Sequence, residues 1–129
     1  MKTKLIFALR IIVALILIQT LRFKFTAHPD SVYIFEQVGL EPIGRIGIGI
    51  AELISGILIL IPRTVWFGAS LTMGIIGGAI IMHLTDLGIE VQGDGGVLFI
   101  TAVATFILSA ILLFIHRKQI PFLGDKLRT

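Results

Sequence analysis

Four long apolar stretches, separated by short polar segments, organise the whole chain. Each holds about 17–19 residues, close to the ~20 that an α-helix needs to cross a ~30 Å hydrocarbon core. The stretches are Leu5–Leu21, Ile43–Ile61, Val65–Met82 and Val97–Ile115. The pattern predicts an all-α polytopic membrane protein: an antiparallel bundle of four transmembrane helices, with loops 22–42 and 83–96 on the side opposite the termini.

The first of these loops is too long and too aromatic for a plain connection. Asp30 or Ser31 is suited to cap a short helix that ends at Gly39. One face of that helix would carry three apolar side chains, namely Val32, Phe35 and Val38. We therefore expect a short helix that lies at the membrane interface. The Gly-Asp-Gly-Gly run of the second loop lacks the length and the lysine of a phosphate-binding loop, and indicates a turn.

Composition supports a membrane protein with a single domain. Of the 129 residues, 56% are hydrophobic, and the mean hydropathy is +1.02. A soluble domain of this size has too much surface for its volume to bury so many apolar side chains. Residues 1–129 are therefore expected to form one membrane domain. The chain has no cysteine, which excludes dithiol chemistry, thiolate metal sites and iron–sulfur ligation by this chain.

Charge predicts the orientation in the membrane. Basic residues gather at the N-terminus, between the second and third spans, and in the C-terminal tail: Lys2, Lys4, Arg63, Arg117, Lys118, Lys126 and Arg128. The hairpin between the third and fourth spans instead carries three acidic residues, Asp86, Glu90 and Asp94. By the positive-inside rule, both termini are cytoplasmic and the protein lies in the cell's inner, cytoplasmic membrane. The basic balance shows no nucleic-acid signature.

Glu52 is the most informative residue, because it lies near the middle of the second span. A carboxylate at that depth costs about 2.5–3.5 kcal/mol on insertion scales, so it needs a partner or a proton. Arg45, Gly49 and Gly56 recur at helical spacing on the same face as Glu52. Desolvation favours the neutral form of this carboxyl group, and a nearby Arg45 favours the charged form.

Other polar residues are predicted at a similar depth or nearer the outer surface. Thr105 and the stretch from Gly74 to Gly78 are level with Glu52, whereas Arg45 lies about 10 Å further out. Two more candidates, His83 and Asp86, close the third span on one face at that outer end. This distribution predicts a polar cleft that opens outward and has Glu52 at its base.

Structural explanations compete with a ligand or proton site. Glu52 could fix helix register as a buried polar group, Arg45 could reach the interface by snorkelling, and His83 could be an interfacial residue at a helix end. Glu52, His83 and Asp86 are of metal-ligand type, but their depths differ, so no metal site is predicted. No nucleophile–base pair or dinucleotide fingerprint indicates an autonomous enzyme.

The order of short motifs resembles the DoxX family. A first span followed by Lys24-Phe25 precedes Glu52-Leu53-x-x-Gly56, an apolar run to Pro62-Arg63, and a third span that ends in His83. The resemblance extends over about residues 4–120. It implies a small four-helix integral membrane protein, linked in some members to thiosulfate:quinone oxidoreductase and in distant animal relatives to assembly or export of membrane proteins. Glu52 and His83 correspond only to motif positions.

The leading hypothesis is an accessory subunit of a membrane oxidoreductase system that holds a quinone- or lipid-like molecule in the outward-opening cleft at Glu52. Quinone is thus a candidate cofactor, with the lipid bilayer, an oxidoreductase or another membrane protein, or a second copy of the chain as partners. The alternative is a non-enzymatic assembly factor or scaffold for other membrane proteins. Proton-coupled transport is less favoured, because no acidic group lies in the cytoplasmic half opposite Glu52.

Overall fold

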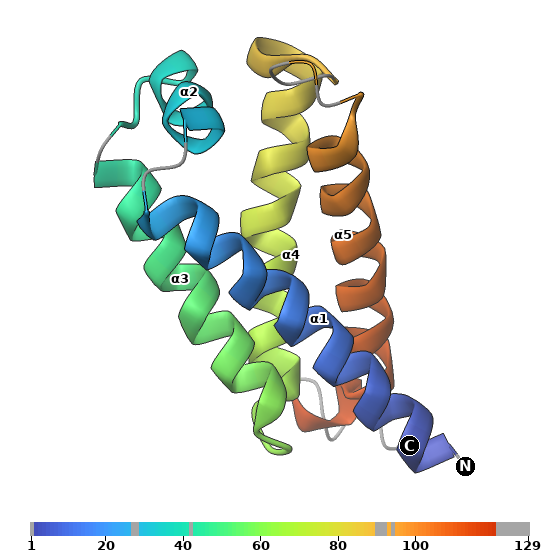
Figure 1. Ribbon diagram of the computed structural model, residues 1–129. Helices are drawn as coiled ribbons and strands as arrows, with labels where there is room; N and C mark the ends of the chain where they lie inside the picture. Colours follow the sequence, from blue (N-terminus) through green and yellow to red (C-terminus); the bar gives the residue numbers. More distant parts are fainter. Residues whose placement is uncertain (1, 27–28, 42, 90–92, 94, 121–129) are drawn as a thin grey trace.

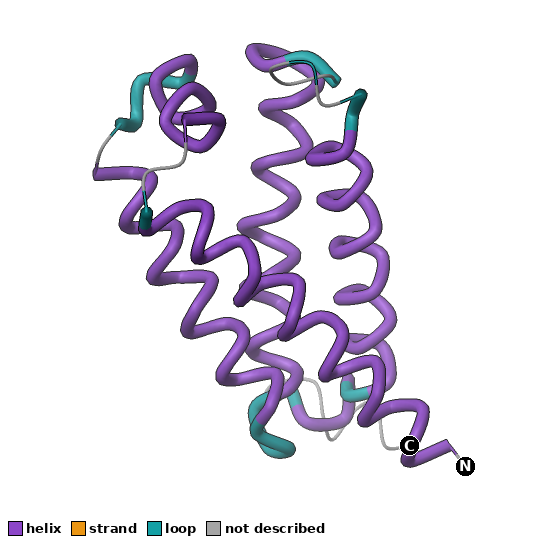
Figure 2. Tube along the Cα trace, in the orientation of Figure 1, coloured by secondary structure: helices purple, strands orange, loops and turns teal. Residues whose placement is uncertain are grey.

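The computed structural model describes residues 2–26, 29–41, 43–89, 93 and 95–120. Four long helices make up most of the described chain, and each is apolar and long enough to span a membrane. They are α1 (Lys2–Phe25), α3 (Ile43–Leu60), α4 (Val65–Met82) and α5 (Val97–Ile115). Three short helices complete the fold: α2 (Pro29–Gln37), the π-helix η1 (His83–Leu87) and the 3₁₀-helix η2 (Arg117–Gln119). The described residues contain no strand (Figure 2), which confirms the predicted all-α transmembrane bundle.

The long helices form two antiparallel pairs, α1 with α3 and α4 with α5. The pairs come together at the end that holds the N-terminus and diverge toward α2 (Figure 1). A tight turn joins α3 to α4, where the Thr64 hydroxyl donates to the carbonyl of Leu58 at 2.8 Å. Gly68 lets these helices approach closely, since a Cβ there would lie 2.8 Å from the Ser55 carbonyl oxygen.

The hydrophobic core occupies the end of the bundle near the termini. Its fully or almost fully buried members come from all four long helices: Val13, Leu17, Ile59, Val65, Ala69 and Leu112. Gln119 of η2 reinforces this end, because its Nε2 donates to the Pro62 carbonyl at 2.7 Å. The α2 end has no comparable cluster among the described residues, and this asymmetry leaves space between the two helix pairs.

Two arginines tie α1 and α3 together at opposite ends. Arg10 of α1 is 9% exposed, and its Nε and Nη2 donate to the carbonyls of Ile59 and Leu60 at 2.9 and 2.6 Å. Arg45 of α3 donates through Nη1 to the carbonyl of Lys24. Each arginine thus satisfies carbonyls at the C-terminal end of the partner helix, where intrahelical donors run out.

At the diverging end, α2 contacts α1, α3 and η1. Phe35 of this short helix is buried, at 5% exposure. The helix is followed by Gly39 at a φ of 74°, a conformation that favours glycine. A short helix in the first loop was expected, although it ends at Gln37 and not at Gly39. The suggested caps, Asp30 and Ser31, have side chains outside the described part.

Two helices are longer than the apolar pattern predicted. α1 runs from Lys2 to Phe25, beyond the expected Leu5–Leu21, and η1 continues α4 into residues that were expected to form a loop. Apolar runs mark the hydrocarbon thickness, whereas lysine and arginine are good helix formers that extend a helix past it. The longer α1 is decisive for the site, because it makes Lys24 part of a helix.

Candidate functional site

A cavity of about 310 Å³ lies between the two helix pairs, in the half of the bundle nearer α2. Apolar side chains form most of its wall, with Phe35 of α2 among them. Its polar lining residues are Thr20 and Lys24 of α1, Glu52 of α3, His83 of η1, and Thr101 and Thr105 of α5. The cavity therefore combines a largely apolar wall with a few polar groups from several elements, the usual character of a small-molecule site.

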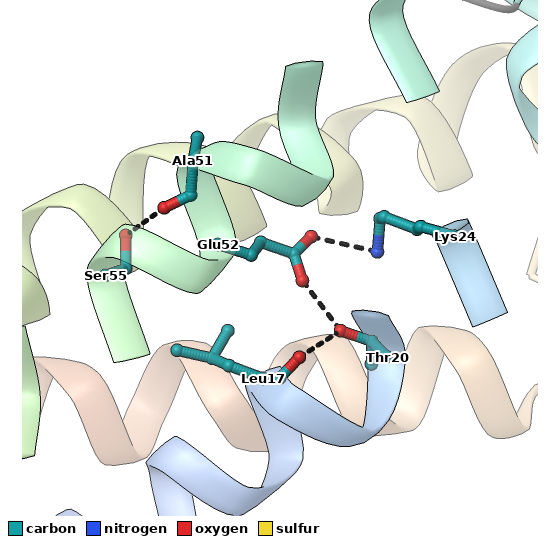
Figure 3. Close-up of polar contacts among 6 residues, drawn as sticks. All are labelled: Leu17, Thr20, Lys24, Ala51, Glu52 and Ser55. Atoms are coloured by element: carbon teal, nitrogen blue, oxygen red, sulfur yellow. Dashed lines mark hydrogen bonds and ion pairs between the residues drawn. The ribbon is translucent and has the colours of Figure 1, made fainter. Parts of the chain in front are cut away.

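Glu52 is held by two residues of α1 (Figure 3). It is 2% exposed. Its Oε1 lies 2.9 Å from Nζ of Lys24, and its Oε2 accepts a hydrogen bond from the Thr20 hydroxyl at 2.7 Å. An ion pair and a hydrogen bond together offset part of the cost of a carboxylate at membrane depth.

The sequence left open whether Arg45 lies close enough to Glu52 to favour its charged form, and the two side chains are not paired in the structure. Nε of Arg45 lies 2.8 and 3.0 Å from the two carboxylate oxygens of Glu41, and Arg45 is not among the cavity-lining residues. Lys24 takes its place, because α1 continues through that residue. The spacing Leu17, Thr20, Lys24 follows one face of a helix and could have revealed the partner, had the helix been extended past Leu21.

Thr20 has two acceptors within reach of its hydroxyl. The hydroxyl lies 2.7 Å from Glu52 Oε2 and 2.8 Å from the carbonyl oxygen of Leu17. The single hydroxyl hydrogen can go to only one of them at a time. Thr20 therefore links the Glu52 carboxyl group to the backbone of α1.

His83 stands on the other wall, where α4 changes from α- to π-helical geometry. It is 5% exposed, and its Nδ1 lies 3.0 Å from the carbonyl oxygen of Gly88. The ring packs edge-on against Phe99, with centroids 5.6 Å apart. Because a carbonyl only accepts, Nδ1 carries the hydrogen, and Nε2 is an acceptor whenever the ring is neutral. Within the described chain, Nε2 has no hydrogen-bond partner.

The remaining candidates differ in how they relate to the cavity. Thr105 lines it, but its hydroxyl already donates to the Thr101 carbonyl at 2.7 Å. Asp86 has its backbone in η1, and its side chain lies outside the described part. Gly74 and Gly78 line the wall of α4, and a Cβ at either would meet nothing within 4 Å. This stretch of wall therefore has open space beside the α4 backbone.

A comparison with protein families adds an independent finding. The model of the DoxX family matches residues 5–84 of the chain. The chain belongs to the DoxX family. Searches of curated proteins and of solved structures each found no match.

The DoxX match covers one wall of the cavity and most of the other. It spans α1 to α4 and includes Lys24, Glu52 and His83, whereas α5 with Thr105 lies beyond it. The matched segment is shorter than the resemblance over residues 4–120 that the motifs suggested. All charged side chains described at the cavity of this DoxX protein therefore come from the part that defines the family.

Proposed function

We propose that this DoxX protein holds a quinone- or lipid-like molecule in the cavity at Glu52 and serves as an accessory subunit of a membrane oxidoreductase system. The supporting observation is a cavity of about 310 Å³ with apolar walls and the Lys24–Glu52 pair at its side. That volume is at the lower end for small-molecule sites. It suits a single head group or ring, with an apolar tail directed toward the membrane.

The polar groups of the two walls suit such a head group. Lys24 has N–H donors beyond the one directed at Glu52, and these can bind a carbonyl oxygen. Glu52 and the Nε2 of His83 can accept from a hydroxyl. A ring between the walls would rest against the backbone at Gly74 and Gly78, where a Cβ would meet nothing within 4 Å. The protein would bind and orient the molecule, while cysteine-based redox steps are excluded for this chain.

The closed end of the bundle favours binding over passage across the membrane. The core cluster fills that end, and Arg10 and Gln119 tie its helices together through carbonyls of the α3–α4 turn region. With both termini cytoplasmic, the cavity lies in the outer half of the cytoplasmic membrane. A membrane-impermeant thiol reagent should then label Gln37→Cys, but not Thr3→Cys, in intact cells.

The deciding experiment is organic extraction and mass spectrometry of protein purified gently from native membranes. We expect a stoichiometric quinone or lipid in the wild-type extract and its loss in Glu52→Gln. Glu36→Gln is the matched control, because Glu36 is exposed on α2 and does not line the cavity. An empty wild-type extract would contradict the proposal, and a co-purifying membrane protein in its place would support the assembly-factor alternative.

A further inference from the structure

We propose that the cavity selects an uncharged amphiphile whose head carries a hydroxyl group, through the self-neutralised Lys24–Glu52 pair on one wall and the His83 Nε2 acceptor on the other. This inference rests on the proposed function, since it specifies the chemical class of ligand in the same cavity. It narrows the proposed quinone- or lipid-like class to quinols and uncharged hydroxyl lipids, and it excludes the charged heads of fatty acids and phospholipids.

The charge argument starts from the pairing of Lys24 with Glu52. These are the two residues with Lys, Arg, Asp or Glu side chains among the described lining residues, and their nearest atoms are 2.9 Å apart. Arg45, which binds the Lys24 carbonyl, is itself paired with Glu41. An anionic head would add a second negative charge beside this neutral pair, and a cationic head would add a second positive charge. Either case leaves one buried charge without a partner, which is strongly unfavourable.

The hydroxyl argument starts from the fixed tautomer of His83. Its Nδ1 hydrogen is directed to Gly88, and contact with Phe99 orients the ring. His83 lines the cavity on the wall opposite Lys24 and Glu52, and its Nε2 is the acceptor that we assign to a ligand hydroxyl. A hydroxyl can donate to Nε2 while its oxygen accepts from another donor. An ether or ester oxygen can only accept, so it would leave Nε2 unsatisfied.

The test uses photoreactive probes that share one diazirine-bearing alkyl chain and differ only in the head: alcohol, carboxylic acid, primary amine or methyl ether. Purified protein in lipid nanodiscs is labelled at neutral pH, and crosslinked peptides of α1, α4 and α5 are quantified by mass spectrometry. We expect the alcohol to label wild type about tenfold more than the acid, amine or ether.

Charge variants should change this order in opposite directions. Glu52→Gln leaves Lys24 unpaired, so the acid becomes the preferred probe. Lys24→Gln leaves Glu52 unpaired, so labelling by the amine probe should increase. The double variant is neutral again and should restore preference for the alcohol, which separates charge selection from misfolding. If the single variants keep the wild-type order, or if wild type labels with the acid as well as with the alcohol, the charge argument is overturned.

His83 is tested separately through the alcohol and its methyl ether. His83→Phe should remove the preference for the alcohol, and His83→Gln, which retains an acceptor, should keep it. A preference that persists in His83→Phe would overturn the hydroxyl argument. Competition by an unlabelled isoprenoid alcohol, a monoacylglycerol or a quinol then identifies the source of the hydroxyl. If no probe labels the cavity, the proposed function fails as well, whereas labelling in the wrong order contradicts this inference alone.

Discussion

The contacts of Glu52 explain how an acidic residue is accommodated within a transmembrane bundle. Lys24 and Thr20 both come from α1, one on each carboxylate oxygen. A buried ion pair of this kind contributes little net stability compared with apolar residues of the same shape, but removing one partner is costly. The stability of the bundle therefore depends on both partners being present.

This energetic asymmetry gives a prediction at the residue scale. Lys24→Met should destabilise the protein by about 3 kcal/mol, because Glu52 remains buried without its cation. The double variant Lys24→Met/Glu52→Leu should recover most of that loss. Unfolding by sodium dodecyl sulfate in mixed micelles measures both free energies. A double variant no more stable than Lys24→Met would show that the two side chains are not coupled.

At the scale of elements, the arginines of α1 and α3 make one rigid pair of helices. Arg10 and Arg45 each reach the C-terminal carbonyls of the other helix, so sliding of α1 along α3 would break bonds at both ends. Lys24 lies close to one of these ends, and its carbonyl is the acceptor for Arg45. We call these contacts of Arg10 and Arg45 the arginine clamp. The clamp fixes the position of Lys24 along the helix axis relative to Glu52.

Substitution of Arg10 tests this clamp. Arg10→Met should lower the unfolding free energy by about 2 kcal/mol, because the carbonyls of Ile59 and Leu60 lose charged donors in a buried site. Arg10→Lys should have an unfolding free energy between those of wild type and Arg10→Met, since an ammonium group lacks the planar fork that reaches two carbonyls. Arg63→Met is the control, because Arg63 is exposed in the α3–α4 turn. Equal stability of the Arg10 and Arg63 variants in the same micelles would contradict the clamp.

The element scale also shows what sequence patterns could and could not predict. Apolar runs gave α3, α4 and α5 to within a residue, because membrane thickness dictates their length. They predicted a first helix shorter than α1, since the charged residues at the ends of α1 lie beyond the apolar run. The sequence drew attention to Glu52 as an acidic residue within a span, but it did not identify Lys24 as its partner, because Lys24 was placed beyond the first helix. A pairing between helices depends on their relative rotation and height, which no single run of residues encodes.

At the scale of the whole molecule, the two helix pairs are packed at one end and separated at the other. The core cluster joins all four long helices near the termini, whereas α2 bridges from α1 and α3 to η1 at the other end. This arrangement produces a cavity without exposing the polar pair, and it limits access from the closed end. The cavity therefore follows from the way the helices are packed. A side chain that fills it should reduce ligand binding without disturbing the packed end of the bundle.

A glycine on the cavity wall allows that distinction to be measured. Gly78→Leu places a side chain into the cavity, and its Cβ meets nothing within 4 Å, so the helix can accept it and gains helical propensity. We expect loss of the co-purified molecule with unchanged or higher thermal stability. Gly47→Leu is the matched control: its Cβ also meets nothing within 4 Å, but Gly47 is exposed and does not line the cavity. Retention of the molecule by Gly78→Leu, or its equal loss from both variants, would place the binding site elsewhere on the protein.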